Sequence, residues 1–129
     1  MYIANARCGG HLTLLFSIHS TDPRLEFQGS RGSGLSIDLG VSTRVVAKQG
    51  CGNVSLVLED CNGNIAPNSN SEIYKLLVKE FSIKGFEVEK WDWEIHLSLE
   101  LPVSQGFGMS AAGLIAVSTA FVEILSLVA

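Results

Sequence analysis

The chain has 129 residues, of which 47% are hydrophobic, and it carries a formal net charge of −4 at pH 7. This length accommodates one domain with a sizeable core. The negative charge and the scattered lysines and arginines exclude the basic stripe of a nucleic-acid-binding domain. Cys8, Cys51 and Cys61 are odd in number and lack Cys-x-x-Cys spacing, so we expect no disulfide scaffold and no zinc site, and we predict a cytoplasmic location.

The first third of the chain predicts short strands that are separated by turns. Tyr2–Cys8 is predicted as a strand, Gly9-Gly10 as a turn, and His11–Ile18 as a second strand. The segment His19–Gly34 is rich in Gly, Ser and Asp, so it is predicted as a loop. Three further segments alternate or carry β-branched residues and are predicted as strands: Leu35–Leu39, Val41–Ala47 and Val54–Leu58.

The middle of the chain predicts a loop followed by an amphipathic helix. Glu59–Asn70 is polar, and its Asn62-Gly63 pair is a turn signal. Ser71 is expected to cap a helix that ends near Gly85. Its apolar face is predicted from the spacing i, i+3, i+4 and i+8, which is occupied by Ile73, Leu76, Leu77 and Phe81.

The segment Trp91–Leu101 is the clearest strand, because apolar and polar residues alternate along its whole length. Such alternation is typical of a strand with one buried and one wet face. The order of elements is several strands, a helix, a strand and a helix. It predicts an α+β two-layer sandwich, in which helices cover one face of a mixed or antiparallel sheet.

Residues 111–129 are almost entirely apolar, and two interpretations were weighed for them. A membrane span needs about 20 apolar residues, but Glu123 and the lack of flanking basic anchors argue against one. We therefore expect a helix buried in a larger fold, no membrane contact, and a chain that is the front part of a longer protein. A helix without its remaining partners would expose apolar surface, so we expect the 129-residue chain to form homo-oligomers.

Residues 102–113 form a glycine-rich loop that is expected to open this helix at Ser110. Glycines let the backbone approach a ligand closely, and a helix start presents unpaired N–H groups, so the loop is suited to a phosphate. Two other interpretations are weaker. A dinucleotide fingerprint needs a buried parallel strand and a later acidic residue, and a hydrolase nucleophile elbow needs a downstream His, which residues 111–129 lack.

A second glycine-rich segment, Gly29–Gly34, carries one cation. Arg31 could fork onto two oxygens of a carboxylate or phosphate, and Ser30 could add a hydroxyl. A solvated hairpin loop is the alternative that composition alone allows.

The loop at 102–113 resembles the Pro-x-x-x-Gly-Leu-Gly-Ser-Ser-Ala-Ala phosphate loop of the GHMP small-molecule kinases. The positions in register with it are Pro102, Gly106, Gly108, Ser110, Ala111 and Ala112. Phe107 replaces Leu, and Met109 replaces the first Ser.

The rest of the chain resembles one branch of these kinases, the archaeal pantoate kinases. That branch carries Pro-Gly-His-Ile-Thr, Asp-Pro, Gly-Ser-Arg-Gly-Ala-Gly and Gly-Phe-Gly-x-Ser segments. The matching segments here, in the same order, are residues 10–13, 22–23, 29–34 and 106–110. The similarity runs from about residue 7 to 120. Gly9 stands where the family has Pro.

The resemblance implies that residues 1–129 are the N-terminal ATP-binding domain of a GHMP kinase, with the C-terminal domain absent. It implies ATP and Mg²⁺ as cofactors and a pantoate-like substrate, whose product would be 4-phosphopantoate, a coenzyme A precursor. Mevalonate or homoserine, or a non-catalytic binding module, are the alternatives. The implied phosphate-binding residues are Pro102, Gly106, Phe107, Gly108, Met109, Ser110 and Ala111. Ser110 would also hold the metal, His11, Ser30 and Arg31 would contact the substrate, and the catalytic residues would lie beyond residue 129.

Overall fold

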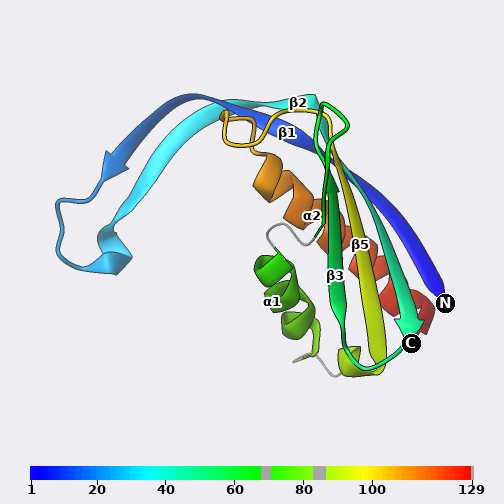
Figure 1. The fold of residues 1–129 in the computed structure, drawn as a ribbon. Coiled ribbons are helices and arrows are strands. Elements are labelled where there is room, and N and C mark those ends of the chain that lie inside the picture. Colours follow the sequence, from blue (N-terminus) through cyan, green and yellow to red (C-terminus); the bar gives the residue numbers. More distant parts are fainter. Residues whose placement is uncertain (68–70, 83–86, 129) are drawn as a thin grey trace.

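The computed structural model describes residues 1–67, 71–82 and 87–128. In these residues two α-helices lie on one face of a five-stranded mixed sheet with the strand order β1-β2-β5-β3-β4 (Figure 1). The strands are Tyr2–His19 (β1), Gly29–Gln49 (β2), Val54–Glu59 (β3), Ile65–Pro67 (β4) and Trp91–Leu99 (β5). The helices are Ser71–Ser82 (α1) and Met109–Val128 (α2). The predicted α+β two-layer architecture is therefore confirmed.

The central strand β5 contributes several of the buried side chains of the hydrophobic core. It pairs antiparallel with β2 and parallel with β3. Trp93, Ile95 and Leu97 are buried beneath the helices, whereas His96 and Ser98 on the other face are exposed. The alternation in the sequence thus identified the buried face correctly, because successive side chains of a strand point to opposite faces.

Helix α2 is buried along one side only, and its other side exposes apolar residues. Ala116, Phe121 and Ile124 are fully buried, and the Phe121 ring lies 4.4 Å, centroid to centroid, from Trp93. Val122 and Leu127 on the outer side are each 57% exposed. By length and composition α2 could also cross a membrane. The sheet covers its inner side, and no described residue covers its outer side.

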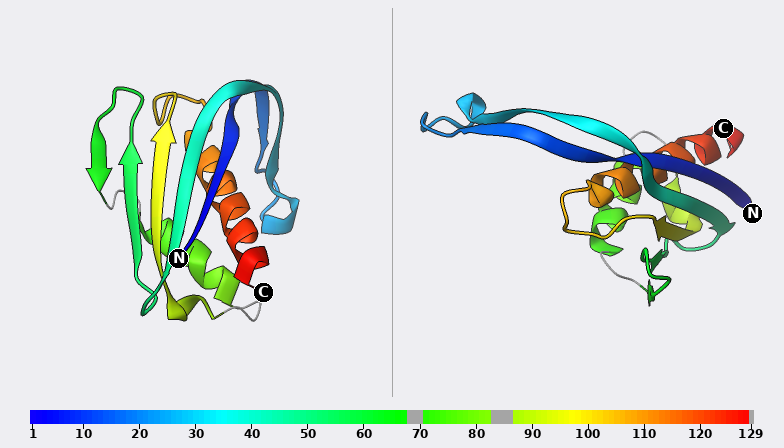
Figure 2. Two further views of the ribbon diagram at one scale, coloured as in Figure 1. Left: turned by 90° about the vertical axis from the view of Figure 1, so that its right-hand side faces the viewer. Right: turned by 90° about the horizontal axis from the view of Figure 1, so that it is seen from above.

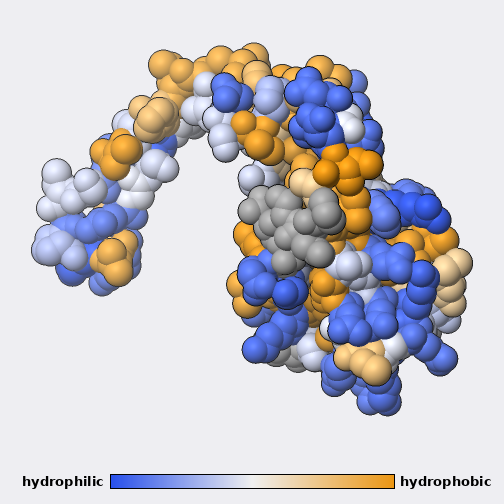
Figure 3. All heavy atoms as spheres, in the orientation of Figure 1, coloured by the Kyte–Doolittle hydropathy of each residue, from blue (hydrophilic) through white to orange (hydrophobic). Residues whose placement is uncertain are grey.

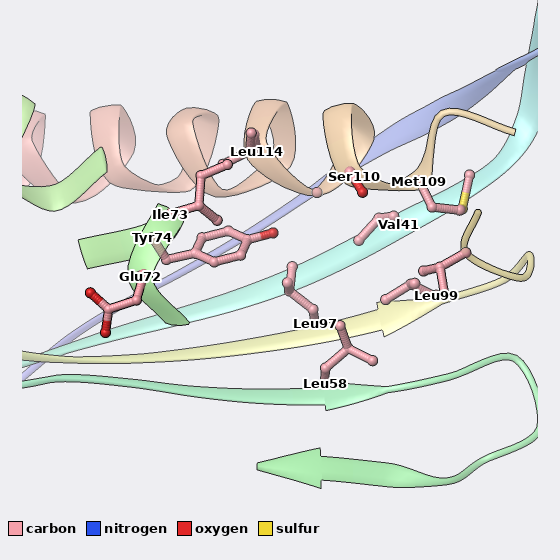
Figure 4. Close-up of a pocket in the computed structure, with 12 residues that line it drawn as sticks. Val41, Leu58, Glu72, Ile73, Tyr74, Leu97, Leu99, Met109, Ser110 and Leu114 are labelled. Atoms are coloured by element: carbon pink, nitrogen blue, oxygen red, sulfur yellow. The ribbon is translucent and has the colours of Figure 1, made fainter. Parts of the chain in front are cut away.

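Helix α1 begins at Ser71 as predicted, but its inner face is rotated from the predicted one. Tyr74 and Val78 are buried, whereas Ile73 and Leu76 are exposed. Tyr74 lies in the cavity between α1, α2 and the sheet (Figure 4), so its burial depends on contacts distant in sequence, which residue spacing within α1 does not report. The predicted helix end at Gly85 lies outside the described residues.

The predicted turn at Gly9-Gly10 and the last part of the predicted loop, residues 29–34, are strand instead, whereas residues 20–28 connect the two strands and include a short 3-10 helix, Leu25–Phe27. Strands β1 and β2 pair along their whole length as a long hairpin, and β-bulges lie between Gly9 and His11 and between Thr13 and Leu15. Bulges let a ribbon bend without breaking its ladder. The outer part of this hairpin, residues 11–36, is called the arm here, and it projects from the body of the molecule (Figures 1 and 2).

The arm exposes many large apolar side chains, which cover much of its outer side (Figure 3). They are Leu12, Leu14, Leu15, Phe16, Ile18, Leu25, Phe27 and Leu35. The predicted polar loop at 59–70 also contains regular structure, since β4 pairs with β3 as a short edge strand. Residues 68–70 of that loop lie outside the described residues, and Gly63 adopts the positive φ of +81° that its turn requires.

Candidate functional site

The glycine-rich loop joins the end of β5 to the start of α2 at one end of the sheet. Gly106 and Gly108 have φ values of +82° and +66°, a region that side-chain-bearing residues rarely adopt. The first helical hydrogen bond is donated by the Ala112 N–H to the Gly108 carbonyl, at 2.9 Å. The N–H groups of the preceding residues 109–111 therefore have no acceptor within the helix. With the partial positive charge of the helix start, they form a site for an anion.

The loop lies directly against the bend of β1. The His11 N–H donates to the Phe107 carbonyl at 2.9 Å. A Cβ atom on Gly108 would lie 3.4 Å from His11 Cβ, and one on Gly10 would lie 2.7 Å from Met109 Cε. The glycine at position 10 thus allows the loop and β1 to approach closely, since a Cβ atom there would also lie 2.8 Å from the Phe107 carbonyl oxygen, whereas the contact at Gly108 is an ordinary one. The helix begins at Met109, one residue before the predicted start.

An ion-pair network that sequence reasoning missed holds the start of the loop. The Glu100 carboxylate accepts hydrogen bonds from the Gly40 N–H and from Arg7 Nη2, both at 2.6 Å. Arg7 also donates to the Asp38 carbonyl at 2.6 Å. The pKa of Glu100 lies below its usual range, mainly because the Gly40 N–H donates to the carboxylate and secondly because Arg7 does. Nothing local predicts this network, because its members lie on three separate strands or loops.

No basic side chain lies on the loop itself, since residues 91–129 contain neither lysine nor arginine. Within the loop and α2 themselves, the groups that could attract an anion are therefore the backbone N–H groups and the helix dipole. Such a site suits a phosphate whose remaining charge is neutralised by another group.

A cavity of about 400 Å³ begins beside the first turn of α2 and extends between α1, α2 and the sheet (Figure 4). Its size is typical of a site for a small ligand. The lining is largely apolar: Val41, Leu58, Ile73, Leu97, Leu99, Val103, Met109 and Leu114, with Gly113. Its polar side chains are those of Glu72, Tyr74 and Ser110.

Tyr74 is a further cavity residue that the sequence did not single out. Its side chain projects from α1 toward the first turns of α2 (Figure 4), and a Cβ atom on Gly113 would lie 2.8 Å from its hydroxyl oxygen. Burial raises the pKa of Tyr74 to about 12, so the hydroxyl keeps its proton at neutral pH. It is therefore available as a hydrogen-bond donor and as an acceptor.

The residues expected to bind phosphate lie together in the loop and the first turn of α2. Pro102 and Gly106 are exposed, and Phe107 is half-buried against the core. Met109 is buried and lines the cavity, whereas Ser110 beside it is exposed and also lines it. Ala111 is exposed on the first turn.

The residues expected to contact the substrate line a separate, shallow groove on the arm. His11, Ser30 and Arg31 all contribute to this groove, whose volume is about 440 Å³. Ser30 and Arg31 pair with Ile18 and Ser17 toward the outer end of the arm, whereas His11 adjoins the phosphate loop through its backbone. In the described part of the chain no carboxylate forms an ion pair with Arg31.

The described residues do not by themselves provide a complete metal site. Among the described residues no group of three or more His, Cys, Asp or Glu side chains could hold a metal. Mg²⁺ commonly takes only one or two protein ligands and completes its shell with phosphate oxygens and water. The hydroxyl of Ser110, an exposed residue in the first turn of α2, fits that mode of binding.

No family model matches the sequence, and no curated protein matches it, so the comparisons that succeed are with solved structures. A phosphotransferase related to the CoA biosynthesis pathway is 22% identical, with a TM-score of 0.62 over 89% of this chain and 37% of its own. A putative sugar kinase from Campylobacter jejuni is 14% identical, with a TM-score of 0.63 over 97% of this chain and 40% of its own. A mevalonate kinase from Methanococcus jannaschii is 17% identical, with a TM-score of 0.52 over 96% of this chain and 40% of its own.

These neighbours agree on the fold. At identities below 25% the likeness concerns architecture, and this chain spans about two fifths of the length of the structures that it matches. The described residues therefore share the fold of part of these kinase structures, with the glycine-rich loop between a central strand and a long helix.

Proposed function

We propose that these residues form the nucleotide-binding part of an ATP-dependent small-molecule kinase, whose full activity requires a longer polypeptide. The observation that carries this proposal is the phosphate loop beside an apolar cavity. The N–H groups of residues 109–111 would hold the phosphates, and the cavity would receive the base. A phosphate site and an apolar pocket side by side are what a nucleotide requires.

The roles of individual residues follow from phosphoryl-transfer chemistry, which depends on positioning and charge neutralisation. Ser110 would bind phosphate oxygens and Mg²⁺, and the metal would neutralise the phosphate charge that the loop leaves uncompensated. Glu100 would not contact the nucleotide itself but would fix the start of the loop through its hydrogen bonds with Arg7 and Gly40.

Pantoate is the substrate that we propose, with mevalonate and homoserine as its competitors. The support is the guanidinium of Arg31 in the arm groove, which forms no ion pair with a described carboxylate and is suited to the carboxylate of a ligand. The neighbour related to the CoA biosynthesis pathway is consistent with this choice. The hydroxyl of pantoate would receive the phosphoryl group and give 4-phosphopantoate.

A longer polypeptide that contains these residues tests the proposal when it is assayed with ATP, Mg²⁺ and each of the three substrates. Ser110→Ala should lower kcat by roughly 100-fold, because a contact to the transferring phosphate is lost. Ser126→Ala on an exposed part of the same helix is its matched control.

Arg31→Ala should raise the KM for pantoate with little change in that for ATP, and Arg44→Ala on the body of β2 is its control. Equal rates with all three substrates would refute the pantoate assignment. Unchanged kinetics in both site variants would refute the two sites.

A further inference from the structure

The cavity beside the phosphate loop contains a polar group, the Tyr74 hydroxyl, for which the described residues provide no hydrogen-bond partner. Tyr74 is 5% exposed, and no described residue forms a hydrogen bond with its hydroxyl. Among the described residues no fully buried polar side-chain atom lacks a hydrogen-bond partner, so the Tyr74 hydroxyl oxygen is accessible from the cavity. Tyr74 therefore has hydrogen-bonding capacity that a ligand in the cavity could satisfy.

The position of the hydroxyl limits what that ligand can be. It lies beside Gly113 in the cavity, one turn along α2 from Ser110 and the unpaired N–H groups. The walls around it are apolar, and they include Leu97 and Leu114. A ligand held at the loop by its phosphates would place a flat, mostly apolar group with polar edges against these walls.

We infer that Tyr74 is a specificity-determining residue, whose hydroxyl forms a hydrogen bond with the heterocyclic base of the bound nucleotide. This inference rests on the proposed function, because it takes the phosphates to lie at residues 106–111. Gly113 contributes by leaving room for the hydroxyl, since a side chain there would meet it at 2.8 Å. The raised pKa of Tyr74 is consistent with this role, because the donor survives throughout the neutral range.

The experiment measures binding of ADP and of tripolyphosphate to the 129-residue chain by calorimetry, in the wild type and in Tyr74→Phe. Loss of one hydrogen bond should weaken ADP binding by roughly 3- to 10-fold. Binding of tripolyphosphate, which has no base, should stay unchanged. Tyr2→Phe is the matched control, since Tyr2 and Tyr74 are the two tyrosines of the chain and Tyr2 packs against Trp91 at a distance from the cavity.

A second ligand identifies the contact more closely. Purine riboside diphosphate lacks the exocyclic amino group of ADP. If the hydroxyl accepts from that group, the Tyr74→Phe effect should vanish with this analogue, and if it donates to a ring nitrogen, the effect should persist. Either result supports a contact with the base.

Thermal unfolding of the ligand-free proteins separates this role from a structural one. Removing an unpartnered hydroxyl should leave the Tm unchanged or slightly raised, because no protein hydrogen bond is lost. A lower Tm in Tyr74→Phe, equal weakening of ADP and tripolyphosphate, or unchanged ADP binding would each overturn the inference. Failure of the wild type to bind either ligand would instead refute the proposed function.

Discussion

Gly63 and Gly106 provide a matched test of the phosphate loop. They have nearly the same backbone conformation, with φ values of +81° and +82°, and a Cβ atom on either would meet nothing within 4 Å. Alanine at either position therefore incurs the same penalty, namely that of a left-handed conformation in a residue with a side chain. That penalty is about 1–2 kcal/mol, in a protein whose total stability is of the order of 5–15 kcal/mol.

The two substitutions should differ only in ligand binding. The open space at Gly106 is the space that a phosphate would occupy, whereas Gly63 lies in the turn between β3 and β4. Urea unfolding should show equal losses of stability, and calorimetry should show ADP binding weakened at least about tenfold in Gly106→Ala alone. Unchanged ADP binding in Gly106→Ala would refute the loop assignment. Equal loss of binding in Gly63→Ala would show that binding follows stability and not the loop.

Three further predictions concern stability and association. Because the pKa of Glu100 is lowered from its ordinary value of 4.5, its stabilising contribution is present above that pH and is lost as the pH falls through the lowered pKa. Glu100→Gln should therefore flatten acid unfolding below about pH 4.5, and an unchanged acid profile would contradict the network. Phe121→Ala should cost about 3–5 kcal/mol in urea unfolding, since the ring is fully buried against Trp93, and a loss under about 1 kcal/mol would mean that it is not a core residue. The chain should self-associate through the arm at roughly tens of micromolar, and the double change Leu15→Lys, Phe16→Lys should give a monomer by sedimentation. If the arm variant still associates and Val122→Lys gives the monomer instead, the chains associate through the outer side of α2.

The parts of the fold that were predicted correctly are those decided locally. The period-two alternation in 91–101 reports which side of β5 is buried, and the glycine-rich loop followed by an apolar run marks the start of α2. The arm could not be predicted in the same way. The glycines and serines of 29–34 are typical of a loop, yet pairing with the leucine-rich part of β1 places them in a ladder.

The candidate site likewise contains residues that could be predicted from local sequence and residues that could not. Residues 102–111 are contiguous in the chain, so their arrangement around a helix start could be predicted from order alone. Glu100 and Tyr74 gain their roles from partners that are distant in sequence. Glu100 lies 60 residues from Gly40, and Tyr74 meets Gly113 only because α1 and α2 pack side by side. Long-range contacts of this kind leave no periodic signal in a single sequence.

The most direct measurement of the central claim is a ¹H–¹⁵N NMR titration of the 129-residue chain with ADP and Mg²⁺. The account predicts that amide shifts concentrate at residues 106–112, with smaller changes around Tyr74, and that Gly63 and the outer end of the arm stay unchanged. Shifts confined to the arm, or an absence of saturable shifts at the start of α2, would contradict a nucleotide site at this loop.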